Sequence, residues 1–472
     1  MRTPLRGRVL PLLAATIMIA TACASPAPSG SPAASPLAAA SAPLASASLP
    51  PAGGERVLEV WTHEFPPFQD ALTKKWIPEF EAANPGVKVK LTAIPFAGVV
   101  AYDAKLLASL SGGAGPDLWD MGDWNYRTFL DNKFVAPLDP ATFGYASDKE
   151  LIDAYQPGTM DVFVRDGKAY GLFSEYNTLN LFYNLDMFEA AGIPPLSETK
   201  PASWDEIGKI SQKLLKTDPA TGAPTQMGYQ FGFFANFRSP QWYAQNFYAL
   251  MRQSGQDDLY VDGKPAANSA AAVSAFQTIY DYTYKYKAYD PTFLNNWFAD
   301  FPKGRVAMVL AGTWFVPAIK QNNPNVRFGV APHPVTNPDD PKTYADIEWS
   351  WGWSVNANRS PEQQKLAQEF MAFMVGKKGE TKQAAYWFSE LGFMQPSNAF
   401  LQSDAYAKKL SSDPWLKVWV DTFKNYKIRY VQHAYDEPGL ALVRAIDRVI
   451  YDRSTAKETA ALLQTELERI AP

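Results

Sequence analysis

Cysteine is almost absent from this chain, since Cys23 is the only one among its 472 residues. A single cysteine excludes an intrachain disulfide and a thiolate metal site, so the apolar core must hold the fold together. Histidine is scarce too, and His63, His333 and His433 are scattered without the spacing of a ligand cluster. We therefore expect no metal and no other cofactor.

Basic runs are also missing. The formal net charge is -4, and no cluster of lysine or arginine offers a surface for phosphates, which argues against nucleic acid as a partner. Neither a Ser-His-Asp elbow nor a phosphate loop is present, and no acid–nucleophile pair is recognisable. We therefore expect a protein that is not an enzyme, although carboxylates beside aromatic residues also describe a glycosidase.

The amino terminus has the layout of an export signal. Arg2, Arg6 and Arg8 precede an uncharged run that is too short to span a bilayer, and Ala20-Thr21-Ala22-Cys23 follows. This pattern predicts a signal peptide over residues 1–22 and a lipid on Cys23, which would anchor the protein to the cell membrane. Ordinary cleavage with a free Cys23 thiol is the alternative, and both interpretations place the protein outside the cytoplasm.

Residues 23–54 are almost entirely alanine, serine, proline, glycine and leucine. Such a composition cannot bury enough apolar surface to offset its ordering entropy, so it predicts a disordered tether. The rest of the chain is about three average domains long, which favours two lobes. Strand-like alternation in residues 56–62 and 87–93 flanks a helical pattern in residues 70–83, as in an α/β fold with a mainly parallel sheet between helices.

Ligands of such sheets bind beyond the carboxyl ends of the strands. This rule selects residues 61–64, which follow the first expected strand, and residues 121–124, which follow the third. The chain also holds 14 Trp, 23 Tyr and 28 Phe, more than its core needs. Some of these rings are therefore expected to line a binding surface, although core packing explains a tryptophan at a strand end equally well.

Several motifs occur in a characteristic order. Residues 166–172 read DGKAYGL and are followed by LFYN at 181–184 and AGI at 191–193, while residues 301–314 read FPKGRVAMVLAGTW and residues 328–334 read FGVAPHP. Together these segments resemble the extracellular carbohydrate-binding proteins of ABC importers, solute-binding protein family 1. The resemblance covers nearly all of the chain after the tether.

The resemblance implies a fold of two doubly wound α/β lobes joined by a hinge with several crossovers, the type II periplasmic binding protein arrangement. The crossovers are expected near Gly171, Pro332 and Gly392. Lobe one would then hold residues 55–170 and 334–391, and lobe two residues 174–330 and 396–472.

The resemblance also implies where a ligand would bind. A sugar offers hydroxyls at its rim and C–H groups on its faces, and these are matched by carboxylates, amides and aromatic rings. Glu175 and Asn177 are alternatives for one hydroxyl acceptor, and Glu64 is either an acceptor or a solvated loop residue. The expected ligand-binding residues are Trp61, His63, Glu64, Asp123, Trp124, Glu175, Tyr176, Asn177, Arg238, Gln241, Trp242, Trp314, Trp351, Gly352 and Trp353.

The function implied is capture of a sugar, an oligosaccharide above all, between the lobes of a monomer and its delivery to the permease subunits of an ABC importer. Two alternatives remain. The same fold could bind another small solute such as a polyamine or an iron complex, or the protein could process glycosides.

Overall fold

The computed structural model describes residues 55–95, 99–232, 239–290, 293 and 297–470. The expected signal peptide, Cys23, the tether and Arg238 lie outside these residues. Within them, no helix has the length and apolar character needed to cross a membrane. The same residues contain no group of three or more His, Cys, Asp or Glu side chains that could hold a metal ion.

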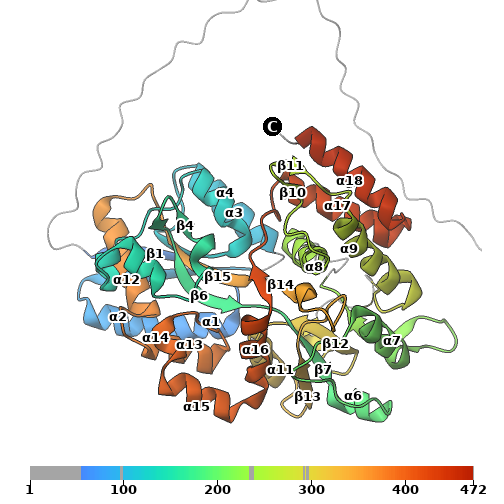
Figure 1. Cartoon of the computed structure of the whole chain (residues 1–472). Coiled ribbons are helices and arrows are strands. Elements are labelled where there is room, and N and C mark those ends of the chain that lie inside the picture. Colours follow the sequence, from blue (N-terminus) through green and yellow to red (C-terminus); the bar gives the residue numbers. More distant parts are fainter. Residues whose placement is uncertain (1–54, 96–98, 233–238, 291–292, 294–296, 471–472) are drawn as a thin grey trace, which may run out of the picture. The chain divides into compact units, whose positions relative to one another are not determined.

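The first of two five-stranded sheets has the strand order β2-β1-β3-β15-β6 (Figure 1). Its strands are β1 (Arg56–His63), β2 (Val87–Ile94), β3 (Leu118–Gly122), β6 (Leu172–Asn177) and β15 (Trp349–Val355). β1 runs parallel to β2 and β3, whereas β15 runs antiparallel to β3 and β6. The carboxyl ends of β1, β3 and β6 therefore meet the start of β15 at one edge.

The second sheet has the order β13-β7-β12-β9-β8. Its strands are β7 (Asn180–Asn184), β8 (Lys216–Thr217), β9 (Pro224–Gln230), β12 (Val306–Ala311) and β13 (Phe328–Ala331). β12 is parallel to β9 and antiparallel to β7, which is itself antiparallel to β13. The ends of β9, β12 and β13 therefore share one edge with the start of β7.

Both sheets are covered by helices on both faces. In the first, Trp353 packs against Phe68 of α1 (Pro66–Ala71), whereas the neighbouring Gly352 faces Tyr126 of α4 (Tyr126–Asp131). In the second, Tyr229 of β9 meets Trp204 of α7 (Trp204–Leu214), while Phe182 of β7 meets helices on the other face. This arrangement confirms the predicted doubly wound α/β class, and it explains why every residue of β3, β6, β7, β12 and β15 is buried.

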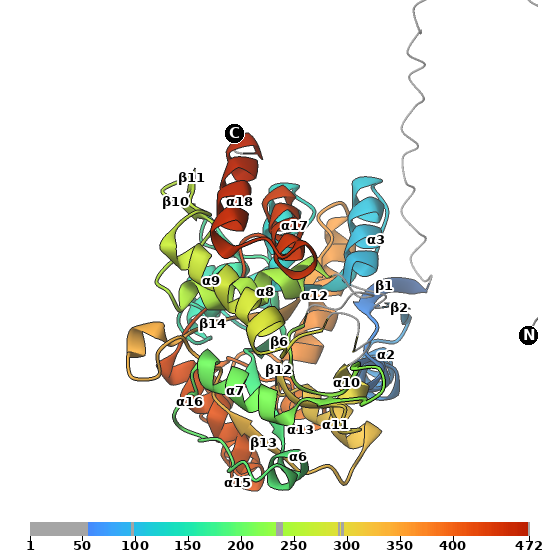
Figure 2. The same ribbon diagram turned by 90° about the vertical axis from the view of Figure 1, so that its right-hand side faces the viewer.

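Further helices surround the two sheets. Figure 2 shows α17 and α18 beside α8 and α9, and these helices contact one another. The longer helices are α2 (Ile77–Ala83), α3 (Val99–Ser111), α8 (Pro240–Arg252), α9 (Ala270–Tyr280), α11 (Phe315–Asn322), α12 (Pro361–Val375), α13 (Lys382–Leu391), α15 (Asp404–Ser412), α16 (Lys417–Asn425), α17 (Glu437–Asp452) and α18 (Ala456–Ile470). The shorter elements are α5 (Asp148–Asp153), α6 (Leu185–Ala190), α10 (Trp297–Asp300), α14 (Asn398–Leu401), β4 (Val164–Arg165), β5 (Lys168–Ala169), β10 (Tyr260–Val261), β11 (Lys264–Pro265), β14 (Ala345–Ile347) and β16 (Lys427–Arg429).

The chain passes between the sheets three times, and two of these passages lie later than the sequence suggested. The first is residues 178–179, because residues 172–177 form β6 and pair with β15 of the first sheet. The second, residues 332–348, starts at the expected place and includes β14. The third runs from α15 to α17 instead of near Gly392 and includes α16 and β16, since Tyr406 of α15 still packs on Phe388 of α13 whereas α17 contacts α8 and α9. Its strand β16 pairs with β14 of the second passage.

Close contact between α7 and β9 yields a prediction about stability. A Cβ atom on Gly228 would lie 2.3 Å from the carbonyl oxygen of Ser211 and 2.4 Å from its Cα, and backbone atoms cannot move aside as a side chain can. Gly228→Ala should therefore destabilise the protein by about 1–3 kcal/mol, the usual cost of overpacking. Thermal unfolding would show a lower Tm. Gly112→Ala is the control, since its Cβ would meet nothing closer than 3.5 Å, and an equal loss in both variants would contradict this account.

Candidate functional site

Each sheet ends in a Gly-x-Trp sequence at its carboxyl edge. β3 ends at Gly122 and is followed by Asp123 and Trp124, and β12 is followed by Gly312, Thr313 and Trp314. A Cβ atom would lie 2.1 Å from the Trp124 ring if it were added to Gly122, and 2.4 Å from Nε1 of Trp314 if it were added to Gly312. Both glycines therefore leave the space that lets an indole fold back over the end of its strand.

These indoles meet further tryptophans in what we call the tryptophan cluster, Trp124, Trp242, Trp314, Trp349 and Trp351. The ring of Trp349 lies 5.6 Å from Trp124, 4.7 Å from Trp242 and 5.5 Å from Trp314, centroid to centroid. Trp351 lies 5.0 Å from Trp124. All five are at most 5% exposed, so rings carried by both sheets pack against one another.

His63 supports this cluster from the end of β1. Its ring stacks on Trp351 with a centroid distance of 3.9 Å, and its Nδ1 lies 2.5 Å from Oδ2 of Asp120. The hydroxyl of Tyr102 donates to the other oxygen of the same carboxylate. Asp120 thus fixes the imidazole against Trp351, so His63 braces a ring of the cluster.

Glu175 and Asn177 differ in how much hydrogen-bonding capacity they have left. The Asn177 amide nitrogen donates to Glu175 Oε1 at 3.1 Å and to Thr313 Oγ1 at 2.7 Å, and its oxygen accepts from the backbone N–H groups of Thr178 and Thr313. These bonds use all the capacity of its amide. Glu175 is therefore the better candidate for a ligand contact, and burial raises the pKa of its carboxyl to about 8.

Two further buried carboxyls, those of Asp123 and Glu348, connect the end of β3 to the start of β15. Asp123 Oδ1 accepts from the backbone N–H of Ser350 at 3.0 Å, and the Ser350 hydroxyl donates to Glu348 Oε1 at 2.8 Å. Burial raises the pKa of Asp123 to about 7, and it raises that of Glu348 well above its ordinary value with help from the Asp123 charge. Burial also raises the pKa of Tyr176, and the charges of Glu348 and Asp123 add to this rise.

Three polar residues beside the cluster were missed from the sequence: Asp103, Asn125 and Gln245. Trp124 Nε1 donates to Asp103 Oδ2 at 3.3 Å, and burial raises the pKa of Asp103 to about 7. Among the described residues, Gln245 Nε2 and Oε1 of the predicted Gln241 are buried without a hydrogen bond. Asp103 and Asn125 are buried as well, and a bond from the Asn125 side chain to the Asp103 carboxyl opposes part of the rise in its pKa. An unmade hydrogen bond of this kind costs about 1–3 kcal/mol, so a polar ligand or water is expected to supply the partner. Asp103 lies inside a helix and carries no sequence signal.

Other predicted residues lie apart from the cluster. The half-buried Trp61 ring faces Lys105 of α3, 5.3 Å from its Nζ, and Glu64 is exposed. Trp353 is fully buried against Phe68 of α1, beneath the first sheet. A Cβ on Gly352 would touch the Phe163 ring at 2.6 Å, so this glycine serves close packing of the sheet.

The comparisons with known proteins bear on this geometry. A family model described as bacterial extracellular solute-binding protein matches residues 65–381. A protein of Brucella abortus (strain 2308) is 27% identical over 259 residues, so the match spans 54% of this chain and little more than half, 57%, of that relative. The arabinooligosaccharide-binding protein of Bacillus subtilis (strain 168) is 24% identical over 352 residues, 72% of this chain and 73% of that protein.

Solved structures share the fold. An ABC transporter solute-binding protein from Thermotoga lettingae TMO, bound to α-D-tagatose, has a TM-score of 0.71 at 21% identity and covers 88% of this chain and 100% of its own. UgpB from Mycobacterium tuberculosis, in complex with glycerophosphocholine, has a TM-score of 0.71 at 19% identity and covers 88% of this chain and 98% of its own. These similarities confirm the predicted type II solute-binding fold.

The raised pKa of Glu175 predicts how stability depends on pH. In the unfolded chain this carboxyl has a pKa near 4.5, whereas burial raises it to about 8 in the folded protein. Its contribution is therefore complete below about pH 4.5 and is lost as the pH rises towards 8. Glu175→Gln cannot ionise, so its ligand-free Tm should match that of the unchanged protein at about pH 4 and exceed it at about pH 8. The exposed Glu198→Gln is the control, and equal pH profiles for all three proteins would refute the prediction.

Proposed function

The chain belongs to the bacterial extracellular solute-binding protein family, and on this premise we propose that it binds an oligosaccharide between its two sheets and delivers it to the permease of an ABC importer. The observation that carries the proposal is the tryptophan cluster, to which both sheets contribute rings and beside which carboxyl and amide groups are buried. The names of relatives such as the Bacillus subtilis arabinooligosaccharide-binding protein support the choice of a sugar.

The chemistry of the site suits a carbohydrate. Indole faces pack against the C–H faces of a sugar ring, and each sugar hydroxyl can donate one hydrogen bond while it accepts others. Asp103 and Asn125 on the first lobe offer an acceptor and a donor, as do Gln241 and Gln245 on the second. Glu175 adds a carboxyl. A wrong sugar would leave some of these buried groups unpaired, which is how such a site discriminates.

Binding requires the two sheets to separate. The Trp242 and Trp349 rings lie 4.7 Å apart, whereas a sugar ring between them needs about 7–8 Å, two van der Waals contacts. A ligand must therefore replace direct ring contact. The free protein would open, and a sugar that contacts both sheets would shift the population to the closed form that the permease recognises.

The family and the amino terminus support a place of action. We place the protein outside the cytoplasm, as a monomer held to the cell membrane by a lipid on Cys23. The Ala20-Thr21-Ala22-Cys23 sequence supports the anchor.

A non-sugar solute is the second candidate, and UgpB favours it because this protein of the same fold is solved with glycerophosphocholine. Several buried carboxyls would also suit a polyamine. A thermal-shift screen decides between the candidates, since a ligand that binds only the folded protein raises Tm. The screen would include arabino-, malto- and galacto-oligosaccharides, monosaccharides, glycerophosphocholine and spermidine. A rise with an oligosaccharide supports the proposal, and a rise with spermidine or glycerophosphocholine alone overturns it.

The same sugars test for catalysis. Incubation with the purified protein, followed by chromatography, should return them unchanged. Shorter products would show a glycoside-processing enzyme instead.

Two truncations test the proposed contacts. Trp242→Ala and Trp314→Ala should each weaken binding of the sugar found in the screen by about tenfold or more, because each removes one ring face. Isothermal titration calorimetry would measure the affinities. Trp415→Ala is the matched control, since this half-buried ring packs on Phe328 and Trp419 in the second lobe. Unchanged affinity in both cluster variants would remove the cluster from the site.

A further inference from the structure

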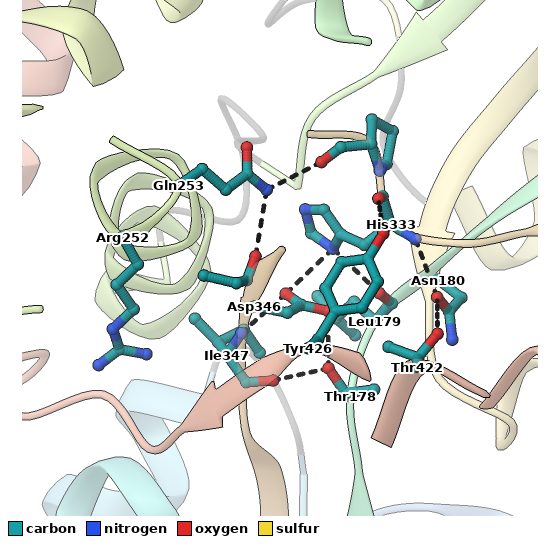
Figure 3. Close-up of polar contacts among 12 residues, drawn as sticks. Thr178, Leu179, Asn180, Arg252, Gln253, His333, Asp346, Ile347, Thr422 and Tyr426 are labelled. Carbon is teal, nitrogen blue, oxygen red and sulfur yellow. Dashed lines mark hydrogen bonds and ion pairs between the residues drawn. The ribbon is translucent and has the colours of Figure 1, made fainter. Parts of the chain in front are cut away.

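Buried polar side chains join the three passages between the sheets to one another (Figure 3). Thr178 and Leu179 form the first passage, and His333 and Asp346 belong to the second. None of these four side chains is more than 1% exposed. Polar groups buried this deeply are stable only when they bond to one another, so their geometry is tightly specified.

Asp346 is the centre of this network. Its Oδ2 accepts from the Thr178 hydroxyl at 2.7 Å, and its Oδ1 accepts from the backbone N–H of Ile347 at 2.7 Å and lies 3.0 Å from Nδ1 of His333. The same Nδ1 lies 3.0 Å from the carbonyl oxygen of Leu179. Because both of its neighbours are acceptors, we assign the imidazole hydrogen to Nδ1. The Asp346 carboxylate thus accepts hydrogen bonds from donors in the first and the second passage.

The third passage is joined to the same residues. The Tyr426 hydroxyl donates to the carbonyl oxygen of His333 at 2.7 Å. The Thr422 hydroxyl donates to Asn180 Oδ1, which also accepts from the backbone N–H of His333. Trp419 Nε1 donates to the carbonyl oxygen of Thr178 at 3.1 Å. All three passages are therefore held in one hydrogen-bonded arrangement.

A buried cation balances the charge of this network. Arg252 of α8 is 4% exposed and donates to the carbonyl oxygens of Arg429 and Tyr430, which lie in the third passage. Burial lowers the pKa of Arg252, and Asp346 is among the acidic residues whose charge raises it again. Asp346 thus interacts with all three passages, directly or through this charge.

The network is complete in the arrangement that brings Trp349 against Trp242 and Trp314. A sugar ring between Trp242 and Trp349 would widen their 4.7 Å gap by only about 3 Å, whereas opening the lobes fully requires the passages to turn, and hinge residues absorb such changes. We propose that Asp346 is a positioning residue that favours the closed arrangement of the two lobes and so sets the apparent affinity for ligand without touching it. The claim about ligand affinity rests on the proposed function, whereas the claim that Asp346 favours the closed arrangement does not.

Asp346→Ala removes the shared acceptor and is the main test. The free protein should then open more often, which small-angle X-ray scattering would record as a larger radius of gyration. Since only the fraction able to close binds fully, sugar affinity should fall by about tenfold. Asp346→Asn should restore both values to within about threefold, because the Thr178 hydroxyl can accept from the new amide and donate to the Ile347 carbonyl oxygen, 2.8 Å away.

Asp339→Ala is the matched control, since this side chain lies in the same passage, is 82% exposed and pairs with Lys200 at the surface. Should Asp346→Ala fail to fold, Thr178→Val tests the same idea by removing one donor while the carboxylate stays. Scattering equal to that of the unchanged protein in every folded variant of Asp346 and Thr178 would overturn the proposal. If the unchanged protein binds no sugar, the proposed function fails, but the scattering comparison still decides the role of Asp346.

Discussion

Direct packing of indole rings from two separate sheets is the interaction on which the rest of this structure depends. Trp349 at the start of β15 meets Trp242 of α8 and Trp314, which follows β12 of the other sheet. Glu175 is only 3% exposed at the same sheet edge, and burial raises the pKa of its carboxyl to about 8. The rings thus create the medium in which hydrogen bonds to a polar ligand are strong.

The same contact explains two local features. Gly122 and Gly312 are needed because each lets the indole of the second following residue lie over its strand. The polar network at Asp346 serves the same contact in our proposal, because it fixes the passages that connect the two sheets. A site between two sheets depends as much on the residues that connect the sheets as on the residues that would face the ligand.

The sequence predicted the fold well because strand and helix periodicity and ordered motifs are local signals. It predicted Trp124, Trp242, Trp314 and Trp351 because they follow strand ends or stand in motifs. It misplaced the first crossover because nothing in residues 172–177 shows that they pair with β15, 172 or more residues away. Asp103 and Gln245 stayed hidden for a similar reason: a polar residue inside a helix looks solvated until the fold buries it beside another segment.

A crystal structure of the protein with the oligosaccharide that raises its Tm most would test the central claim directly. The account predicts a sugar ring between Trp242 and Trp349, with the two indoles further apart than 4.7 Å and hydroxyls bonded to Asp103 or Glu175. A sugar bound elsewhere, with these two indoles still in contact, would contradict it.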